Sequence, residues 1–408
     1  MSLSNFLTTL SKKMSSPPIY LKKNADHRLR AGHLWIYSNE IDTHKSPLTG
    51  FEAGQEVTIV SQHGQPLGVG YVNPHSLICT RLLSRDAQVS LNTSLLEQRL
   101  SVALSLRARL FDKPFYRLVF GESDLLPGLV VDRFDDILVV QLTTAGMERV
   151  RSEILTALET VLQPRAIVLR NDSSIRILEG LANYVEVASG KLPSEVFVEE
   201  NGMRSYVPIL EGQKTGWFYD HRVNRRHLLT YVKQQRVLDV FSYTGAWGIQ
   251  AAVAGAKAVW CVDSSAKALE YVRHNAILNE VSDRVQTLQG DAFDVLKTLR
   301  GEGHQFDVIV LDPPAFIKRK KDQAAGEEAY RRLNQLAVQL LSQAGILVSA
   351  SCSLHLSADS LREFLGAASR QVDRHLQILE QGHQGPDHPI HPVIPETNYL
   401  KAFTCRVL

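Results

Sequence analysis

Two short motifs in the last quarter of the chain carry residue types that could do covalent chemistry. Asp312 follows the apolar run 308–311, and Cys352 follows the apolar run 346–350. Both runs read as buried parallel strands. If the strands are neighbours, the acid and the thiol lie side by side at the carboxyl edge of the sheet, where open α/β sheets bind ligands. Adjacent strands lie about 5 Å apart, so both groups could touch one substrate ring. A thiol beside a carboxylic acid is suited to attack on an electron-poor heterocycle.

Three more acids follow apolar runs of the same kind, and together they predict a cofactor site. Asp239 precedes a turn that contains Gly245 but lacks the GxGxxG pattern of dinucleotide folds. A carboxylate there repels pyrophosphate and suits the ammonium of an amino acid. Asp263 can accept hydrogen bonds from two ribose hydroxyls, and Asp291 from an adenine amino group. These three parts make up S-adenosylmethionine. One such acid could simply cap the next helix, but three in succession favour the cofactor.

The elements that must position these residues alternate between strands and helices from about residue 206 onward. Strands are predicted at 236–241 and 258–263, and helices at 248–255 and 264–279, with Ser264 as the cap of the second helix. Repeated βα units predict an α/β fold class with a doubly wound, mostly parallel sheet.

The first half of the chain has a different pattern. Short β-rich runs at 56–60, 67–72 and 77–83 are separated by turn residues and predict a small β-barrel. A helix over 95–111 and an amphipathic segment over 148–162 then alternate with strands, which predicts an α+β middle region. The expected parts of the chain are a flexible tail at 1–18, the barrel at 19–93, the middle domain at 94–205 and the sheet domain at 206–408.

Composition narrows the class of protein only a little. The chain has 408 residues and a formal net charge of +2, so charge alone neither requires nor excludes a nucleic-acid partner. The cysteines are far apart and form no CxxC pair, which argues against a disulfide framework and for a reduced, cytoplasmic setting. They are Cys79, Cys261, Cys352 and Cys405. His383, His388 and His391 match no zinc spacing, so no metal is expected. No apolar run is long enough to cross a bilayer.

With these motifs in order, the chain resembles the 23S rRNA cytosine-C5 methyltransferases that carry an N-terminal PUA domain, the RlmI type. The motifs FSYTGAWG, LDPPAF and SCS stand in the order that the family has. The resemblance covers nearly everything after the tail. Its other segments are 21–41, which looks like the PUA opening, 121–134, 212–225 and the closing loop 384–396. It implies a PUA-like RNA-binding barrel and a Rossmann-like, class I methyltransferase domain that uses S-adenosylmethionine.

The resemblance also implies roles for individual residues. Cys352 would be the nucleophile, and Asp312 would steady the base. The residues implied to hold the cofactor are Tyr219, Asp220, Arg222, Asp239, Phe241, Ser242, Thr244, Gly245, Asp263, Ser264, Asp291 and Ala292. The residues expected to contact the substrate are Pro313, Pro314, Phe316, Lys318 and Arg319.

This set of groups suits methylation of cytosine at C5, which is a poor nucleophile. Thiolate addition at C6 makes the ring enamine-like, and a carboxylic acid near N3 stabilises the charge that develops there. Loss of the C5 proton then expels the thiolate. Some cytosine-C5 enzymes carry a second cysteine after the first proline of the DPP-like motif. Here that position is Pro314, so the group that removes the proton is unidentified.

Several sequence features bear on RNA, the expected partner. Arg28, Arg30, His33, Trp35 and Tyr37 mix basic and aromatic side chains that suit backbone contact and stacking. The basic run 318–321 follows the Asp312 motif and suits a phosphate contact. Phe316 either stacks on a base or is a core residue of the next helix. Position 315 is Ala, where related chains often have Lys or Thr, and this leaves the target nucleotide open.

Other functions remain open from the residues alone. A guanine-N7 rRNA methyltransferase has the same domain plan, but such chains lack the cysteine that Cys352 provides. A non-catalytic RNA-binding or ribosome-assembly factor would keep the fold, although the intact acids argue against decay. A small-molecule methyltransferase would leave the N-terminal barrel without a role. A homodimer is an alternative to a monomer. The substrate is expected to be free 23S rRNA or a large-subunit precursor.

Overall fold

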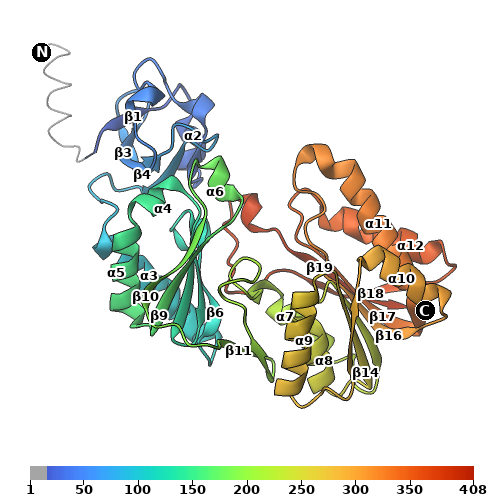
Figure 1. The fold of residues 1–408 in the computed structure, drawn as a ribbon. Coiled ribbons are helices and arrows are strands. Elements are labelled where there is room, and N and C mark those ends of the chain that lie inside the picture. Colours follow the sequence, from blue (N-terminus) through green and yellow to red (C-terminus); the bar gives the residue numbers. More distant parts are fainter. Residues whose placement is uncertain (1–15) are drawn as a thin grey trace, which may run out of the picture. The chain divides into compact units, whose positions relative to one another are not determined.

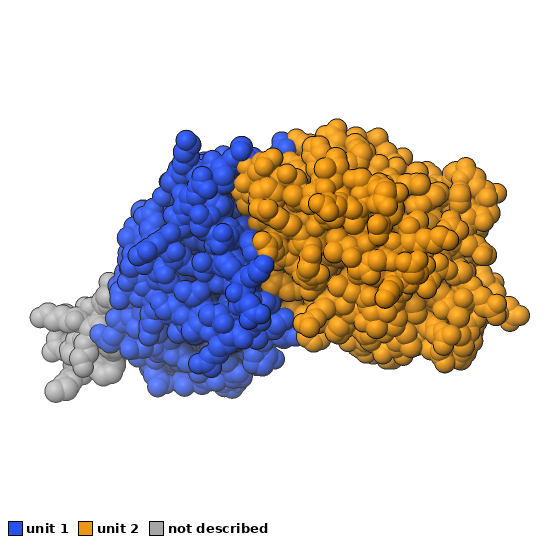
Figure 2. Space-filling view, turned by 90° about the horizontal axis from the view of Figure 1, so that it is seen from below, with its two compact units in different colours: residues 1–194, 208–217, 386–397 blue, residues 195–207, 218–385, 398–408 orange. Residues whose placement is uncertain are grey.

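The computed structural model describes residues 16–408, so the predicted tail, residues 1–18, lies outside the described residues except for its last three (Figure 1). The chain forms two compact units, each built from separate stretches of sequence (Figure 2). Unit 1 contains residues up to 194, 208–217 and 386–397; unit 2 contains 195–207, 218–385 and 398–408. The predicted domain boundaries at 93 and 205 stay a prediction.

Unit 1 begins with a small five-stranded sheet of order β1-β3-β4-β5-β2. Its elements are β1 (Pro18–Tyr20), α2 (Asp26–Arg30), β2 (Trp35–Ile36), η1 (Ser38–Glu40), η2 (Leu48–Gly50), β3 (Gln55–Val60), β4 (Pro66–Val72) and β5 (Thr80–Ser84). Apolar side chains on one side of these strands, including Ile19 and Val57, pack with Ile394 from the third stretch of the unit. The three predicted strands are present, although the last begins at Thr80 rather than at Leu77.

The rest of unit 1 is a second five-stranded sheet of order β10-β9-β8-β7-β6, flanked by helices. Its elements are α3 (Thr93–Leu110), β6 (Phe115–Phe120), η3 (Gly121–Asp124), β7 (Leu129–Phe134), β8 (Ile137–Leu142), α4 (Ala145–Arg149), α5 (Arg151–Leu162), β9 (Ala166–Asn171), α6 (Ile175–Leu178), β10 (Tyr184–Gly190) and η6 (Pro395–Thr397). Asn92 caps α3 by accepting a hydrogen bond from the Leu95 amide. The predicted amphipathic segment 148–162 is α5 with the end of α4.

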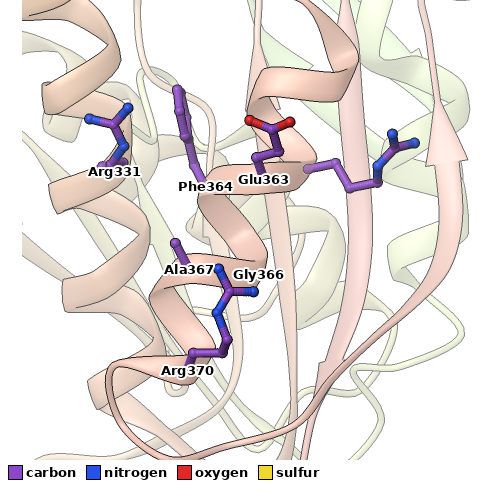
Figure 3. Close-up of a pocket in the computed structure, with 7 residues that line it drawn as sticks. Arg331, Glu363, Phe364, Gly366, Ala367 and Arg370 are labelled. Atoms are coloured by element: carbon purple, nitrogen blue, oxygen red, sulfur yellow. The ribbon is translucent and has the colours of Figure 1, made fainter.

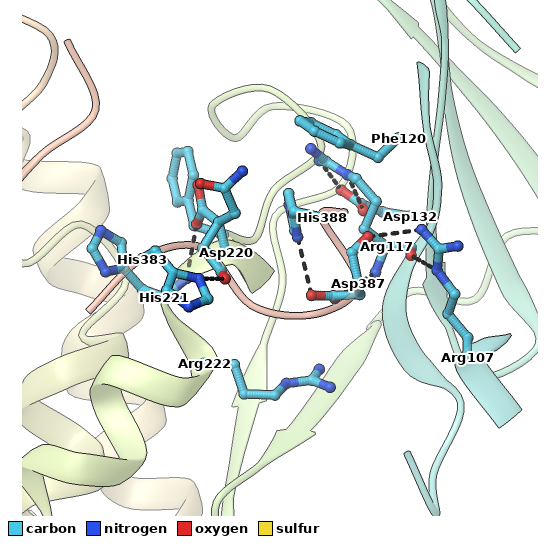
Figure 4. A network of polar contacts seen from close by, with 12 residues as sticks. Arg107, Arg117, Phe120, Asp132, Asp220, His221, Arg222, His383, Asp387 and His388 are labelled. Carbon is cyan, nitrogen blue, oxygen red and sulfur yellow. Dashed lines mark hydrogen bonds and ion pairs between the residues drawn. The ribbon is translucent and has the colours of Figure 1, made fainter. Parts of the chain in front are cut away.

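A buried arginine ties the stretch 386–397 into unit 1. Arg107 on α3 is fully buried, and its guanidinium binds both carboxylate oxygens of Asp124 at 2.6 and 2.8 Å. Its Nη2 also donates to the carbonyl of Asp387 at 2.8 Å, and the Asp387 carboxylate accepts the backbone N–H of Arg117 (Figure 4). Because a buried charge is costly unless it is paired, these contacts fix the stretch firmly in place.

Unit 2 is a doubly wound sheet, as predicted. The strand order is β15-β14-β13-β16-β17-β19-β18; all pairs are parallel except those made by β19, which runs antiparallel to both of its neighbours. The strands are β13 (Arg236–Val240), β14 (Ala258–Asp263), β15 (Val285–Gln289), β16 (Phe306–Leu311), β17 (Leu341–Ser351), β18 (Leu376–Gly382) and β19 (Lys401–Val407). The central strands β13 and β16 are apolar and nearly fully buried, as strands covered on both faces must be.

Helices cover both faces of this sheet (Figure 1). They are η4 (Tyr219–His221), α7 (Arg222–Leu228), α8 (Ala246–Val253), α9 (Ala266–Leu278), α10 (Ala292–Gly301), η5 (Lys320–Asp322), α11 (Gln323–Leu340) and α12 (Ala358–Arg370). α7, α8 and α9 pack in sequence on one side, and α10, α11 and α12 on the other. A hairpin, β11 (Phe197–Glu200) and β12 (Met203–Tyr206), contacts α8 and α9. In the described part of the chain, no helix has the length and apolar character needed to span a membrane.

Candidate active site

The two chemistry-bearing motifs follow neighbouring strands, as the sequence predicts. β16 pairs with β17 in parallel, with Leu311 opposite Ser349. Asp312 is the first residue after β16, and Cys352 is the first after β17. Since β13 is the other neighbour of β16, the loop that contains Phe241 to Gly245 ends at the same carboxyl edge. The acid, the thiol and the predicted cofactor loop therefore belong to three adjacent strands of one sheet.

Asp312 is held by two donors from the helical layer. His221 Nε2 lies 3.1 Å from its Oδ1, and the indole Nε1 of Trp247 donates to its Oδ2 at 3.0 Å. Burial pushes the pKa of Asp312 upward, but the charge and hydrogen bond of His221, with the bond from Trp247, hold that pKa below its ordinary value. We expected a carboxylic acid at this position; the folded protein instead carries a carboxylate at neutral pH. The side chain is 23% exposed, so a ligand can reach it.

His221 is itself fixed from several sides. Its Nδ1 lies 3.1 Å from Nδ2 of Asn224, and its backbone N–H donates to Asp220 Oδ1 at 3.0 Å (Figure 4). Burial disfavours the charged ring, yet the Asp312 carboxylate raises the pKa of His221 above its usual range. Asp220 in turn accepts a hydrogen bond from Tyr399 at 2.6 Å. The pair His221 and Asp312 therefore holds one proton at the edge of the sheet in a fixed geometry.

The turn that carries Cys352 is built by its two serines. Ser351 Oγ donates to the Tyr330 hydroxyl at 2.8 Å, and that hydroxyl lies 2.9 Å from Ser353 Oγ. Ser353 Oγ also accepts the backbone N–H of Ile317 at 3.2 Å. This last bond joins the turn after β17 to the loop after β16. Both serines are fully buried, whereas Cys352 between them is partly exposed.

The other three cysteines are buried. Burial raises the pKa of the Cys79 thiol to about 11 and that of Cys405 to about 12, and it raises the pKa of Cys261 well above the ordinary value. Such thiols are poor nucleophiles because the thiolate is the reactive form. Cys352 is thus the thiol whose exposure suits chemistry.

The end of β13 and the loop after it hold polar atoms that need a ligand. Asp239 Oδ1, Ser242 Oγ and Thr244 Oγ1 are buried and have no hydrogen-bond partner among residues 16–408. Asp239 Oδ2 accepts the Gly248 amide at 2.8 Å. Burial raises the pKa of Asp239 to about 7, and the nearby carboxylates add to the shift. Buried polar atoms are normally paired, so these atoms fit the ammonium and carboxylate of an amino-acid moiety, as S-adenosylmethionine carries when bound.

Backbone conformation supports the same use of this loop. Phe241, Tyr243 and Gly245 have φ angles of 66°, 48° and 87°. The first two are costly for residues with a side chain, and such strain is concentrated at ligand sites. At Gly245 an added Cβ would lie 2.9 Å from Ile249 Cγ1. The loop therefore bends sharply and presents its backbone to a ligand.

Asp263, the last residue of β14, and Asp291, two residues after β15, have structural partners beside the role predicted for them. Asp263 accepts the amides of Tyr243 and Ser265, both at 2.9 Å, one on each oxygen. Asp291 caps α10 through Oδ1, which accepts the amides of the two residues after Ala292. Capping is thus part of what Asp291 does, and Ala292 is buried beneath it. The cap of α9 is Ser265 rather than the predicted Ser264, which is exposed.

Three of the predicted cofactor residues, Tyr219, Asp220 and Arg222, lie in the segment that carries His221. Tyr219 is fully buried, and the Arg222 guanidinium lies 5.0 Å from its ring centroid. Arg222 also pairs with the buried Glu200 at 3.3 Å. Asp220 holds Tyr399 and the Gly385 amide. The structure thus gives these three residues packing roles in the segment that carries His221.

The predicted substrate residues divide into buried and exposed ones. Pro313 is buried and Pro314 is exposed. Phe316 lies in the loop before α11 rather than on that helix, and it packs against the core, with its ring centroid 4.9 Å from that of Tyr330 and 6.2 Å from that of Phe241. Lys318 and Arg319 are exposed, and Arg319 pairs with Asp322 at 3.1 Å.

The mixed basic and aromatic residues of the first sheet are partly used within unit 1. Arg28 donates to the carbonyl of Trp35 at 2.9 Å and lies 4.8 Å from the Tyr37 ring centroid. The Trp35 indole donates to Glu122 at 2.8 Å, and Arg30 pairs with Asp26. Burial and the nearby Arg28 charge lower the pKa of His33.

The three late histidines have separate surroundings. His383 belongs to unit 2, whereas His388 and His391 belong to unit 1. His388 is buried, with Nδ1 3.0 Å from Asp387 Oδ1 and its ring beside Phe120 (Figure 4). Among the residues that the structure describes, no group of three His, Cys, Asp or Glu side chains could hold a metal ion.

A hollow of about 450 Å³ on α11 and α12 is a different kind of site. Arg331, Arg362, Arg370 and Glu363 line it (Figure 3). Arg331 pairs with Glu328 and Arg362 with Asp359 on their own helices. None of the residues predicted to hold cofactor or substrate lines it, and it is a charged surface depression rather than a cofactor pocket.

Four residues of the site were not predicted. His221 and Trp247 bind Asp312, and Tyr330 and Lys401 flank Cys352, the last by donating from Nζ to the Ser353 carbonyl at 2.6 Å. The spacing of the strands gives no signal for contacts between residues so far apart in sequence. A signal did exist for His221, which directly follows two residues that the resemblance implied.

Known proteins share this architecture. Family models match a PUA-like domain at residues 19–85 and an S-adenosylmethionine-dependent methyltransferase at residues 151–404. Ribosomal RNA large subunit methyltransferases I from Shigella boydii serotype 18 and Escherichia coli O157:H7 are each 36% identical over 96% of this chain and 99% of theirs.

Solved structures agree at the level of the fold. A SAM-dependent methyltransferase from Streptococcus mutans is 22% identical, with a TM-score of 0.80 over 96% of this chain and 100% of that one. A methyltransferase complexed with SAH gives a TM-score of 0.81 at the same identity and coverage. These findings confirm the predicted fold class and cofactor. The chain belongs to the S-adenosylmethionine-dependent methyltransferase family that includes the ribosomal RNA large subunit methyltransferases I and carries an N-terminal PUA-like domain.

Proposed function

We propose that this protein methylates C5 of a cytosine in 23S rRNA through a covalent bond between Cys352 and C6 of the base. The observation that carries the proposal is the pairing of β16 with β17, which brings a carboxylate and a partly exposed thiol to one sheet edge beside the β13 loop. The relatives from Shigella boydii and Escherichia coli act, by their names, on ribosomal RNA of the large subunit. A thiol at this place has no function in methylation of an exocyclic amine or of guanine N7.

The proposed chemistry assigns one task to each group. S-adenosylmethionine, when bound, supplies an electrophilic methyl group. Cys352 adds through sulfur to C6, and C5 gains electron density. After methylation the C5–H bond breaks, its electrons form the C5–C6 double bond, and the C6–S bond breaks to release the thiolate. A thiolate is the best nucleophile that a side chain offers at neutral pH.

Asp312 and His221 handle the charge that addition places on the ring. The carboxylate can accept a hydrogen bond from the exocyclic amino group of cytosine. The proton on His221 Nε2 is hydrogen-bonded to the same carboxylate. Passing that proton through Asp312 to N3 would neutralise the negative charge as it develops. General acid catalysis of this kind contributes about 10²- to 10⁴-fold. The protein thus stores the proton in an ion pair rather than on a neutral acid.

RNA binding is proposed to use the PUA-like domain together with the basic run Lys318 to Lys321. These four side chains are exposed or nearly so and follow the Asp312 loop directly. Phe316, four residues after Asp312, packs on Tyr330 and Phe241 and is partly exposed, so it is available to contact a base. We place the reaction in the cytoplasm, where rRNA is made and assembled.

Two alternatives make different demands on the site. A guanine-N7 enzyme needs no nucleophile, and would leave Cys352 without a task. A non-catalytic assembly factor needs no cofactor, and would leave Asp239, Ser242 and Thr244 with buried atoms that lack partners. Each alternative leaves part of the site without a function, and this favours the cytosine-C5 enzyme.

The test is a comparison of rRNA from cells with the protein, without it, and with Cys352→Ala. Mass mapping should find one 5-methylcytosine in 23S rRNA that is absent from the last two samples. In vitro, RNA with 5-fluorocytosine at that position should form a denaturation-resistant adduct, because fluorine cannot leave C5 as a cation in place of the proton. Cys352→Ala should form none.

Cys79→Ala is the matched control, since it removes a buried thiol of unit 1. It should keep both the modification and the adduct. Retained methylation by Cys352→Ala would refute the covalent route. Loss of a modified guanine instead of a cytosine would favour the N7 alternative, and an unchanged map would favour the non-catalytic one.

A further inference from the structure

Strand β19 brings a lysine to the nucleophile. β19 runs antiparallel to β17, with Lys401 directly opposite Ser351. Residues opposite each other in an antiparallel pair project to the same face. Lys401 is the first residue of its strand, as Ser351 is the last of β17, so its side chain stands where the chain turns into Cys352. Its Nζ donates to the carbonyl of Ser353 at 2.6 Å. The amine is thereby anchored one residue beyond the thiol.

The amine and the thiol interact electrostatically. Burial lowers the pKa of Lys401 to about 8, and Cys352 acts in the opposite direction by favouring the ammonium. The other titratable group shown to interact with Cys352 is Tyr330 on α11, whose pKa is raised by burial and also by Cys352. Tyr330 is engaged with Ser351 and Ser353 through its hydroxyl. Of these two groups, Lys401 is the one that can carry a positive charge.

We propose that Lys401 takes up the proton of the Cys352 thiol and stays beside the sulfur as an ammonium, so that Cys352 meets the substrate as a thiolate. The S–H bond breaks with its electrons left on sulfur, and an N–H bond forms on Nζ, so the step needs no other reactant. Lys401 is a positioning residue, because it acts through Cys352. Its use in catalysis rests on the proposed function, but the state of the thiol does not.

A lysine suits this task in these surroundings. An ammonium within a few ångströms favours a thiolate most where water is partly excluded. A partly buried amine also releases and accepts protons near neutral pH, unlike an exposed lysine. The anchoring bond to Ser353 keeps Nζ in place after the proton has moved. The charge is therefore present before any substrate binds.

The experiment measures alkylation of Cys352 by iodoacetamide against pH in the full-length protein, without RNA or cofactor. Cys352→Ala gives the blank for the three buried cysteines. Wild-type protein should react with a midpoint below that of a free thiol. Lys401→Met should react about tenfold more slowly at pH 7 and approach the wild-type rate above pH 9. Lys401→Arg should stay within about threefold of wild type, because its permanent positive charge also favours the thiolate, with the thiol proton then released to solvent.

Exposed Lys257→Met is the matched control and should leave the profile unchanged. An unchanged profile in folded Lys401→Met would overturn the inference. So would a wild-type midpoint at or above that of a free thiol, a result that does not depend on the variants folding. A shifted profile without any 5-methylcytosine in rRNA would instead refute the proposed function and leave this inference standing.

Discussion

The loop after β13 and the turns after β16 and β17 end at the same edge of one sheet, yet their polar groups are in opposite states. At the end of β13 and in the loop after it, three buried polar atoms have no partner within residues 16–408, and Phe241 and Tyr243 have strained φ angles. After β16 and β17, Asp312 is held by His221 and Trp247, and the serines by Tyr330.

The difference separates a ligand-binding region, the β13 loop, from a catalytic region, the turns that carry Asp312 and Cys352. The β13 loop is completed only when a ligand supplies the missing hydrogen bonds, so its stability and its function are in conflict. The Asp312 and Cys352 turns are arranged in advance, as catalysis requires of groups that must hold one geometry. Variants of the first should change binding, and variants of the second should change turnover.

Asp239→Asn should have the largest effect on the ligand-binding region, the β13 loop. It should weaken S-adenosylmethionine binding by at least about 100-fold, because the amide cannot pair with an ammonium. The same change should stabilise the free protein at pH 8 by roughly 2–4 kcal/mol. The pKa of Asp239 is raised to about 7, so its contribution to stability is present at low pH and is lost as pH rises through that value. Asparagine does not ionise, so the variant does not lose this stability as pH rises.

Calorimetric titration and urea unfolding at pH 5 and pH 8 check both parts. The gain in stability should be larger at pH 8. Asp283→Asn, at an exposed acid of the same unit, should alter neither quantity. Tight cofactor binding by Asp239→Asn would remove this residue from the site.

His221→Gln should lower turnover by about 10²-fold while cofactor affinity stays nearly constant, because it removes the proton that Asp312 shares. The pKa of His221 is raised and that of Asp312 lowered. Their pairing therefore stabilises the fold fully between about pH 4 and pH 6.5. It weakens as pH rises through the pKa of His221 or falls through that of Asp312.

The difference in unfolding free energy between wild type and His221→Gln should follow this window. His274→Gln is a control at an exposed histidine of α9. Equal loss of cofactor affinity and turnover would mean that His221 contributes to cofactor binding rather than to catalysis.

Neutralising the basic run Lys318 to Lys321 with glutamine should weaken RNA binding several-fold at moderate salt. The slope of log affinity against log salt should fall by about one unit for each phosphate that the variant no longer binds. A matched variant neutralises Arg331, Arg362 and Arg370 around the hollow on α11 and α12. Equal slopes for the two variants would mean that the run after Asp312 makes no special contribution to RNA binding.

Tyr330→Phe should have the smallest effect. It removes the hydroxyl that joins Ser351 and Ser353, and should cost about 1–2 kcal/mol of stability and a few-fold in turnover. Tyr231→Phe, which loses one bond to Glu380 on the surface of the same unit, is the control. A turnover loss as large as that of His221→Gln would mean that Tyr330 does more than hold the turn.

The identity of these strands was predictable because apolar runs and their ends are local. The runs 308–311 and 346–350 identified β16 and β17, and the structure confirms the condition that the two strands are neighbours. The acids at strand ends followed for the same reason. Ser264 was wrong as a cap by one residue, since Ser265 has the extended conformation that a cap needs.

The partners of the site residues were not predictable in this way. Lys401 reaches Cys352 only because β19 inserts between β17 and β18 in the reverse direction. His221 lies before the first strand of the sheet and reaches Asp312 across 91 positions in the sequence. The protonation of Asp312 depends on that interaction, so the sequence alone predicted a neutral acid where the fold holds an anion.

The route of the chain limits how this protein can be divided. Cutting after residue 205 to obtain the methyltransferase half would carry away 386–397, and with it the carbonyl and carboxylate of Asp387 that Arg107 and Arg117 use. A methyltransferase fragment that ended before residue 386, so as to exclude that stretch, would lack β19. Neither unit can be expressed as one continuous fragment that keeps all of its own elements.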